Sequence, residues 1–136
     1  VGSEMCIRDS CRRSGFVNNI FGRKTHIIGI NDKNFNVRNF QERAAINAPI
    51  QGSASELMRI AMIRIFNKLN DHTKFKTKLL LQIHDELIFE IPNNELDRIK
   101  KLIKTEMTSV KSSEHHTFSI PILVDVNIGD NWGMLH

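Results

Sequence analysis

The alternation of apolar and polar residues is clearest along residues 79–91. On either side of a central break every second position is apolar, at Leu79, Leu81 and Ile83 and then at Leu87, Phe89 and Ile91. This alternation predicts two half-buried strands joined as a hairpin. The break is His84-Asp85-Glu86, where a tight hairpin turn usually has Gly or Asn-Gly.

The three ionisable residues of this turn make it the first candidate for chemistry. Two adjacent carboxylates repel each other, so Asp85 and Glu86 add nothing to the stability of a turn. Sequences break local rules most often at functional sites. From the hairpin alone, the alternative that both carboxylates are solvated turn residues stays open.

A helical pattern occupies the middle of the chain. Residues 41–48 suit a helix, and Pro49 is expected to end or kink it because proline lacks the N–H of a helical hydrogen bond. The pattern restarts at Ser53, which forms a capping box with Glu56. From there to Leu69 nearly every face is apolar. This predicts a helix buried on most sides, partly by elements that so short a chain does not contain.

A row of polar residues crosses this region at a spacing of four. Arg43, Asn47 and Gln51 share one helical face if the helix continues through Pro49. In a duplex minor groove, purine N3 and pyrimidine O2 accept hydrogen bonds at every base pair, whatever the sequence. The polar row therefore predicts sequence-independent contact with a duplex. An exposed polar stripe on an amphipathic helix is the alternative.

The first part of the chain predicts a second hairpin. Two short apolar runs, residues 15–21 and 25–30, surround the basic turn Gly22-Arg23-Lys24. Basic side chains in this part either contact phosphates or form solvated surface: Arg12, Arg13, Arg23 and Lys24.

Two further elements complete the expected fold. Residues 92–110 predict a helix whose apolar face consists of Leu96, Ile99, Ile103, Met107 and Val110. Residues 120–128 alternate again and predict a third strand. An antiparallel sheet made of the hairpin and this strand, with helices packed on it, is an α+β fold.

Residues 1–11 show neither period and do not begin with Met. We interpret them as a non-native or disordered leader that does not take part in the fold. Residues 12–136 then form the structured part.

Composition narrows the classes of protein. At 136 residues, with 40% hydrophobic residues, the chain makes one domain, and its net charge of +4 permits a polyanionic partner. No apolar run is long enough to span a membrane. Two cysteines without a CxxC pair favour reduced thiols in the cytoplasm. His115-His116 lacks further ligands at zinc spacing and is interpreted as a surface loop.

Four stretches taken together resemble the family A DNA polymerases. Gln82-Ile83-His84-Asp85-Glu86-Leu87 resembles the third conserved polymerase motif of that family, and residues 42–54 resemble the segment that precedes it. Phe21-Gly22-Arg23 and Gly129-Asp130-Asn131-Trp132 resemble flanking landmarks in the family's order. The resemblance runs from about residue 12 to the end.

The resemblance implies the C-terminal part of the fingers and palm of a bacterial polymerase, and hence an incomplete domain with an antiparallel palm sheet. Asp85 resembles one of two aspartates that hold a pair of Mg²⁺ ions. Glu86 resembles an accessory carboxylate near the metals, and His84 a residue beside the primer terminus that contacts the DNA. The polar row matches positions that contact primer–template DNA in the minor groove.

The implied activity is DNA-directed DNA synthesis in replication and repair. The partners would be primer–template DNA and a dNTP, and the protein would be a monomer within a longer chain. The family's second metal-binding aspartate, in a segment resembling Asp-Tyr-Ser, is absent, and the chain contains no Tyr at all. The two Mg²⁺ ions would share an aspartate missing from this chain, so we expect the chain alone to be inactive. Asp125 has little weight as a substitute.

Two alternatives stay open. A single-subunit, phage-type RNA polymerase shares the His-Asp turn, although Glu86 and the Pro-Ile-Gln-Gly run argue against it. The other is a non-catalytic nucleic-acid-binding module with a degenerate palm.

Overall fold

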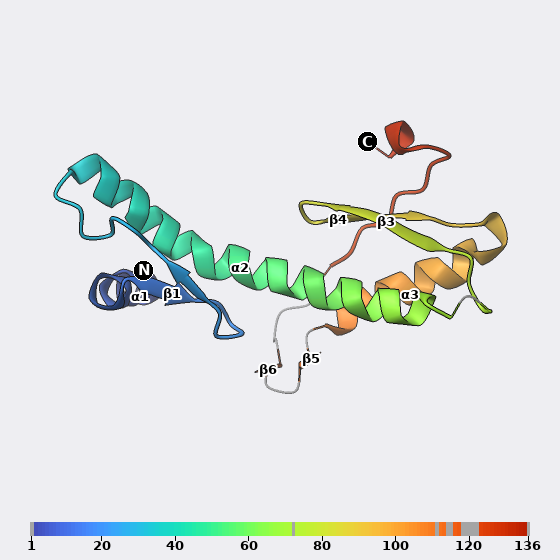
Figure 1. The fold of residues 1–136 in the computed structure, drawn as a ribbon, viewed down its shortest axis with the longest axis horizontal. Helices are drawn as coiled ribbons and strands as arrows, with labels where there is room; N and C mark the ends of the chain where they lie inside the picture. The colour runs from blue at the N-terminus through green and yellow to red at the C-terminus, as the bar shows by residue number, and fades with distance from the viewer. Residues whose placement is uncertain (1, 72, 111, 114–115, 118–122, 136) are drawn as a thin grey trace. The chain divides into compact units, whose positions relative to one another are not determined.

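The computed structural model describes residues 2–71, 73–110, 112–113, 116–117 and 123–135 (Figure 1). The chain forms two compact units, Val1–Glu56 and Leu57–His136, and the helix α2 (Phe35–Leu69) runs through both. Each unit is described by itself. The combination of helices with small antiparallel sheets confirms the predicted α+β class.

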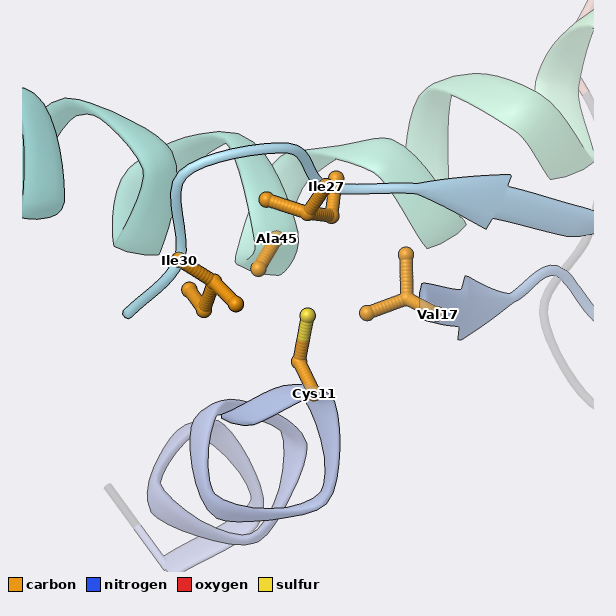
Figure 2. Close-up of a cluster of buried hydrophobic side chains, with 5 residues drawn as sticks. All are labelled: Cys11, Val17, Ile27, Ile30 and Ala45. Atoms are coloured by element: carbon orange, nitrogen blue, oxygen red, sulfur yellow. The ribbon is translucent and has the colours of Figure 1, made fainter. Parts of the chain in front are cut away.

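In the first unit, the helix α1 (Gly2–Ser14) is followed by the strands β1 (Phe16–Asn18) and β2 (Lys24–His26). The two strands pair antiparallel, which confirms the predicted hairpin with its basic turn. Figure 2 shows the small core of this unit, where side chains from α1, β1, α2 and the segment after β2 point toward one another. Its buried members are Cys11, Val17, Ile27, Ile30 and Ala45.

The interpretation of residues 1–11 as lying outside the fold is corrected by α1. Cys11 has no exposed surface and its thiol points into the core of the first unit (Figure 2). Burial of this side chain also raises the pKa of the thiol. Sequence periodicity missed the helix because Cys11 and the half-buried Ile7 supply most of its apolar contact. That these residues are foreign to the chain stays a prediction.

The helix α2 continues through Pro49, so the prediction that a new helix begins at Ser53 with a capping box is wrong. Ser53 is buried in the middle of the helix, where its hydroxyl donates to the carbonyl of Pro49 at 2.6 Å. The same oxygen accepts the backbone N–H of Ile20 at 3.1 Å. Proline removes one helical donor only, and these contacts hold the following turn in place.

The turn between β1 and β2 is tied to α2 by a buried asparagine. The side-chain oxygen of Asn19 accepts the backbone N–H groups of Phe21 and Arg23, each at 2.9 Å, and its amide donates to the carbonyl of Gly52 at 3.4 Å. Gly22 has a φ of 79°, which glycine adopts without strain. The basic turn is therefore fixed against the helix.

In the second unit, the strands β3 (Lys78–Ile83) and β4 (Glu86–Glu90) form the predicted hairpin. A short helix η1 (Asn93–Glu95) leads into α3 (Leu96–Ser109), which confirms the predicted helix. The core is made of the following buried residues: Ile65, Leu69, Ile99 and Ile103. Leu87 and Phe89 of β4 pack against this core, so it supports the hairpin.

The pairing of β3 with β4 contains a bulge that the alternation did not reveal. Leu79 lies opposite Phe89, but the register shifts before Leu81, which leaves Leu80 as the extra residue. Because cross-strand partners point to the same face, Leu79 lies on the same face of the hairpin as Phe89. Leu81 and Ile83 fall on the other face, so the prediction that they share a face with Leu79 is wrong.

The predicted third strand does not form in the part of residues 120–128 that the structure describes. Residues 123–128 have no regular secondary structure, and residues 120–122 lie outside the described residues. His116, interpreted with His115 as a surface loop, instead begins the two-residue strand β6 (His116–Thr117), which pairs with β5 (Ser112–Ser113); His115 lies outside the described residues. The last helix in the described part of the chain is the short η2 (Trp132–Met134).

The second half of α2 is buried only in part by the described chain, and its burial by elements from outside the chain stays a prediction. Ile63 is 51% and Phe66 55% exposed. Together with Met62 and Leu79 they line a shallow apolar groove of about 200 Å³ on the second unit.

A buried carboxylate fixes the chain where it enters β3. Glu95 accepts the backbone N–H of Lys76 at 2.8 Å, and the N–H and hydroxyl of Thr77 at 3.1 and 2.7 Å. The hydroxyl of Thr77, followed by the N–H of Lys76, lowers the pKa of Glu95. Because these donors favour the ionised form, the contacts stabilise the fold when Glu95 is charged.

The stabilisation by Glu95 should depend on pH with a definite sign. A lowered pKa in the folded state contributes stability above the unfolded-state pKa, about 4.3, and this is lost as the pH falls through the folded-state value. Glu95→Gln should therefore lower the urea midpoint at neutral pH, with the difference shrinking in acid. The measurement is urea unfolding followed by circular dichroism between pH 2 and pH 7.

Glu90→Gln is the matched control, because the side chain of Glu90 is exposed and makes no hydrogen bond among the described residues. A constant difference between wild type and Glu95→Gln at every pH would contradict the proposed linkage.

Candidate nucleic-acid interface and acidic turn

The first unit carries a groove of about 540 Å³ beside α2. The helix contributes one wall, which includes all three residues of the polar row, Arg43, Asn47 and Gln51. The other wall comes from β2 and the residue after it, namely Thr25, His26 and Ile27. Because α2 is continuous through Pro49, the predicted alignment of the polar row on one face is correct.

The polar row is exposed and has no partner within the described chain. The side chains of Arg43, Asn47 and Gln51 make no hydrogen bond or ion pair there. Their donors are therefore available to an acceptor in the groove. The residues that line the groove include no Asp or Glu, so the groove offers donors and positive charge.

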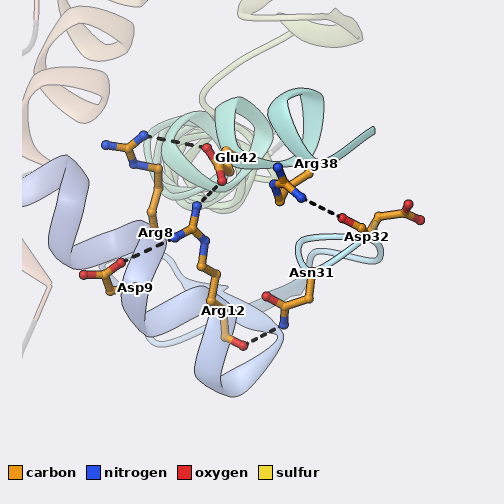
Figure 3. A network of polar contacts seen from close by, with 7 residues as sticks. All are labelled: Arg8, Asp9, Arg12, Asn31, Asp32, Arg38 and Glu42. Carbon is orange, nitrogen blue, oxygen red and sulfur yellow. Dashed lines mark hydrogen bonds and ion pairs between the residues drawn. The ribbon is translucent and has the colours of Figure 1, made fainter. Parts of the chain in front are cut away.

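Several basic side chains of the first unit have polar partners, and Figure 3 shows those around Glu42. Arg12 forms an ion pair with Glu42, and Arg8 approaches the same carboxylate at 3.7 Å. The hydrogen bond from Arg12 lowers the pKa of Glu42. Arg23 pairs with Glu56 at 3.3 Å. Arg12 and Arg23 thus have carboxylate partners, which leaves fewer of the predicted phosphate contacts free.

In the second unit, the acidic residues lie at the tip of the hairpin. β3 and β4 are joined by a two-residue turn, His84-Asp85, and Glu86 is the first residue of β4, opposite Ile83. All three ionisable side chains are exposed. The structure thus brings His84, Asp85 and Glu86 together at one exposed point, as the sequence predicted.

His84 adopts an unusual backbone conformation at this tip. Its φ is 52°, in the left-handed region that favours glycine, and among the described residues it is the one non-glycine residue there. The side-chain amide of Gln82 donates to the carbonyl of His84 at 3.2 Å. A histidine at a position suited to glycine costs backbone energy, and such outliers gather at functional sites.

The ligand types at the hairpin tip suit a metal ion, but there are too few ligands for a complete metal site. Carboxylate oxygens are the ligands that Mg²⁺ prefers, and Asp85 and Glu86 supply two adjacent carboxylates. Within the part of the chain that is described, no group of three or more His, Cys, Asp or Glu side chains could hold a metal. A complete site would therefore need a ligand from outside these residues.

Sequence reasoning missed several residues that shape the groove. Phe40 is 65% exposed and lines it beside Gln41, and His26 lines it from β2. The alternation in β2 is too short to assign a face, and Phe40 precedes the polar row by less than one turn. The spacing of residues along a helix predicts the wall of the groove that this helix forms. The wall formed by β2 can be identified only from the structure.

The helices of the described residues offer no segment suited to crossing a membrane. Residues 5–134 match the model of DNA polymerase family A, and the chain belongs to this family. This confirms the resemblance found in the sequence.

The chain is similar to the DNA polymerase I of Lactococcus lactis subsp. lactis, at 46% identity over 129 residues. The match covers 95% of this chain and 14% of that protein. It is 41% identical to the DNA polymerase I of Caldicellulosiruptor bescii, over 89% of this chain and 14% of the relative. The chain thus spans about one seventh of these curated relatives.

A solved structure shares the fold. The polymerase domain of Pol1 from M. smegmatis, in complex with DNA primer-template and dNTP, matches with a TM-score of 0.85 and 31% sequence identity. The match covers 97% of this chain and 22% of that one.

Proposed function

We propose that this chain forms the C-terminal fingers and palm part of a DNA-directed DNA polymerase that acts in replication and repair. The supporting observation is the acidic tip of the β3–β4 hairpin, in a chain that belongs to DNA polymerase family A. The polymerase would be a monomeric, cytoplasmic protein that transfers a nucleotide from a dNTP to the primer 3′-hydroxyl. The M. smegmatis polymerase domain was solved in complex with DNA primer-template and dNTP, which supports these partners.

We assign the hairpin tip to catalysis. Asp85 would hold Mg²⁺ together with an aspartate from outside this chain, and Glu86 would assist as a second carboxylate near the metals. A pair of Mg²⁺ ions, when bound, would activate the primer hydroxyl and neutralise the departing pyrophosphate. Asp85 and Glu86 are exposed and have no protein partner among the described residues, so their oxygens are free for metal.

His84 would lie beside the primer terminus and contact the DNA. The two-residue turn holds the backbone of His84 at the tip, where its carbonyl accepts the side-chain amide of Gln82. A rigid hairpin is a suitable support because positioning contributes most of the catalysis in phosphoryl transfer.

The groove of the first unit would receive the duplex part of primer–template DNA. The polar row would donate to purine N3 and pyrimidine O2 in the minor groove, where the acceptor pattern is nearly independent of sequence. Such contacts sense the shape of a base pair without reading its identity. The absence of acidic side chains from the groove lining supports a polyanionic ligand.

Asn47→Ala and Gln51→Ala should each weaken binding of a short duplex by this chain, roughly three- to tenfold, since one hydrogen bond contributes about 0.5–1.5 kcal/mol. The loss should be equal for A·T-rich and G·C-rich duplexes. Fluorescence anisotropy with a labelled duplex at 50 mM salt measures it.

Asn67→Ala is the matched control, because Asn67 is an exposed amide on the same helix outside the groove lining. Lower thermal stability of Asn47→Ala and Gln51→Ala with unchanged duplex affinity would favour the simple polar stripe.

Family membership weighs against the RNA polymerase alternative, and ribonucleotide incorporation by a polymerase carrying this chain would reinstate it. A non-catalytic binding module would show duplex affinity without any dependence of primer extension on Asp85.

A further inference from the structure

Two side chains of β2 have no role that the polar row explains: His26 lines the second wall of the groove, and Lys24 lies two residues earlier on the same strand, outside the lining residues. Lys24 and His26 are alternate residues of β2, so they lie on the same face of the hairpin. Both contact the ring of Phe16 on β1. The amine of Lys24 is 4.4 Å from the ring centroid, and the imidazole centroid of His26 is 5.9 Å away with the rings at 67°.

These contacts hold both side chains without using their hydrogen-bonding groups. A cation over an aromatic ring and an edge-to-face ring pair restrict orientation but leave the N–H donors free. Neither Lys24 nor His26 forms a hydrogen bond or ion pair within the described chain. Arg23, the neighbouring cation, differs because it is paired with Glu56.

The residues that line the groove beside this wall include no acidic side chain. His26 lines the groove opposite α2, and Arg43 is the charged residue that α2 contributes to the lining. Phe16 on β1 is neutral. Glu56, which pairs with the neighbouring Arg23, is not among the residues that line the groove. A polyanion entering the groove would therefore meet donors on both sides.

We propose that Lys24 and His26 form a phosphate-binding wall, which contacts the sugar–phosphate backbone of the duplex whose minor groove receives the polar row. This inference rests on the proposed function of the groove. The two walls would make different contacts. The polar row would contact base edges, and the β2 wall would contact the phosphates of the duplex and so fix its register. Lys24 contributes a point charge, and His26 donates from a ring that Phe16 orients.

Duplex binding by the 136-residue chain, measured between 50 and 200 mM salt, tests this wall. Lys24→Gln should reduce the slope of log affinity against log salt by about one, so that its affinity falls roughly fourfold less over this range than that of the wild type. His26→Ala should weaken binding roughly three- to tenfold at 50 mM salt, equally for all duplex sequences. Lys33→Gln, in the loop before α2, is the matched control and should change neither quantity.

The outcomes separate this inference from the proposed function. Weaker binding by Lys24→Gln and His26→Ala, with melting temperatures close to that of the wild type, supports the wall. Unchanged binding by both, while Asn47→Ala still weakens it, overturns the wall and leaves the groove as the duplex site. If Asn47→Ala and Gln51→Ala are also without effect, both proposals are overturned. If Lys33→Gln and Lys24→Gln have equal effects on binding, Lys24 acts only through the general surface charge, and the proposed wall is overturned as well.

Discussion

Asp85→Ala should abolish primer extension by a polymerase that carries this chain. Transition-state charge in nucleotidyl transfer is stabilised mainly by metal ions, and loss of a metal ligand removes several kcal/mol of that stabilisation. At 1.36 kcal/mol for each factor of ten, the rate should fall roughly a thousandfold or more. Glu86→Ala should lower it less, since an accessory carboxylate holds the metals less directly.

A chimera provides the experiment. The segment of the Lactococcus lactis DNA polymerase I that matches this chain, at 46% identity, is replaced by the chain, and extension of a labelled primer is followed with Mg²⁺ and dNTPs. The chain alone should give no extension, because the second aspartate is absent. Asp125→Ala is the matched control, since Asp125 is an exposed acid outside the hairpin and should leave the rate unchanged.

Three observations separate the possible results of that experiment. The side chain of Asp85 has no partner in the described chain, so Asp85→Ala should unfold at the same temperature as the unsubstituted chimera. Extension at the unsubstituted rate would refute the assignment of Asp85 as a metal ligand. An unsubstituted chimera that binds primer–template but does not extend it would contradict the polymerase proposal itself.

The hairpin tip could be predicted from sequence because its signals are local. Alternation on both sides of a charged break locates two strands and a turn within 13 residues of sequence, and the structure agrees on the position of the turn. The bulge at Leu80 could not be predicted in this way. An apolar residue in an apolar run gives no sign that it is the extra one, so its face depends on packing against the core.

Pro49 and Ser53 in α2 show more clearly why sequence rules for helix ends can fail. Pro49 and Ser53 predict an interruption, yet the helix continues because its neighbours compensate. Ala45 is fully buried four residues before Pro49, and Ser53 bonds to Ile20 from a hairpin distant in sequence. Packing of the helix outweighs one lost hydrogen bond, and the contacts that decide it are not local.

Buried polar residues were missed for the same reason. Asn19 and Glu95 each satisfy several backbone donors, and their partners include residues 33 positions away for Asn19 and 18 or 19 positions away for Glu95. In the sequence they resemble ordinary loop residues. The polar row was found because its spacing is regular, whereas its opposite wall required the fold.

Ile65→Ala should destabilise the second unit more than any surface change. Ile65 has no exposed surface, and the core it forms with Leu69, Ile99 and Ile103 supports the β4 residues Leu87 and Phe89. Truncation of a buried isoleucine removes apolar burial and leaves a cavity, which together cost about 2–5 kcal/mol. Because β4 rests on this core, we expect the acidic tip to lose its support as well.

Ile63→Ala is the matched control, which separates the effect of burial from that of helix propensity. It is the same substitution two residues earlier in α2, but the side chain of Ile63 is 51% exposed. The free energy of unfolding should therefore change by no more than about 1 kcal/mol. Urea unfolding gives the difference in free energy, and hydrogen exchange of the β3–β4 peptides shows where protection is lost. Equal losses for the two variants would mean that the core around Ile65 does not hold the hairpin. Exchange that rises in Ile65→Ala alone, at the strands flanking Asp85, would connect the stability of this core to the rigidity that metal binding requires.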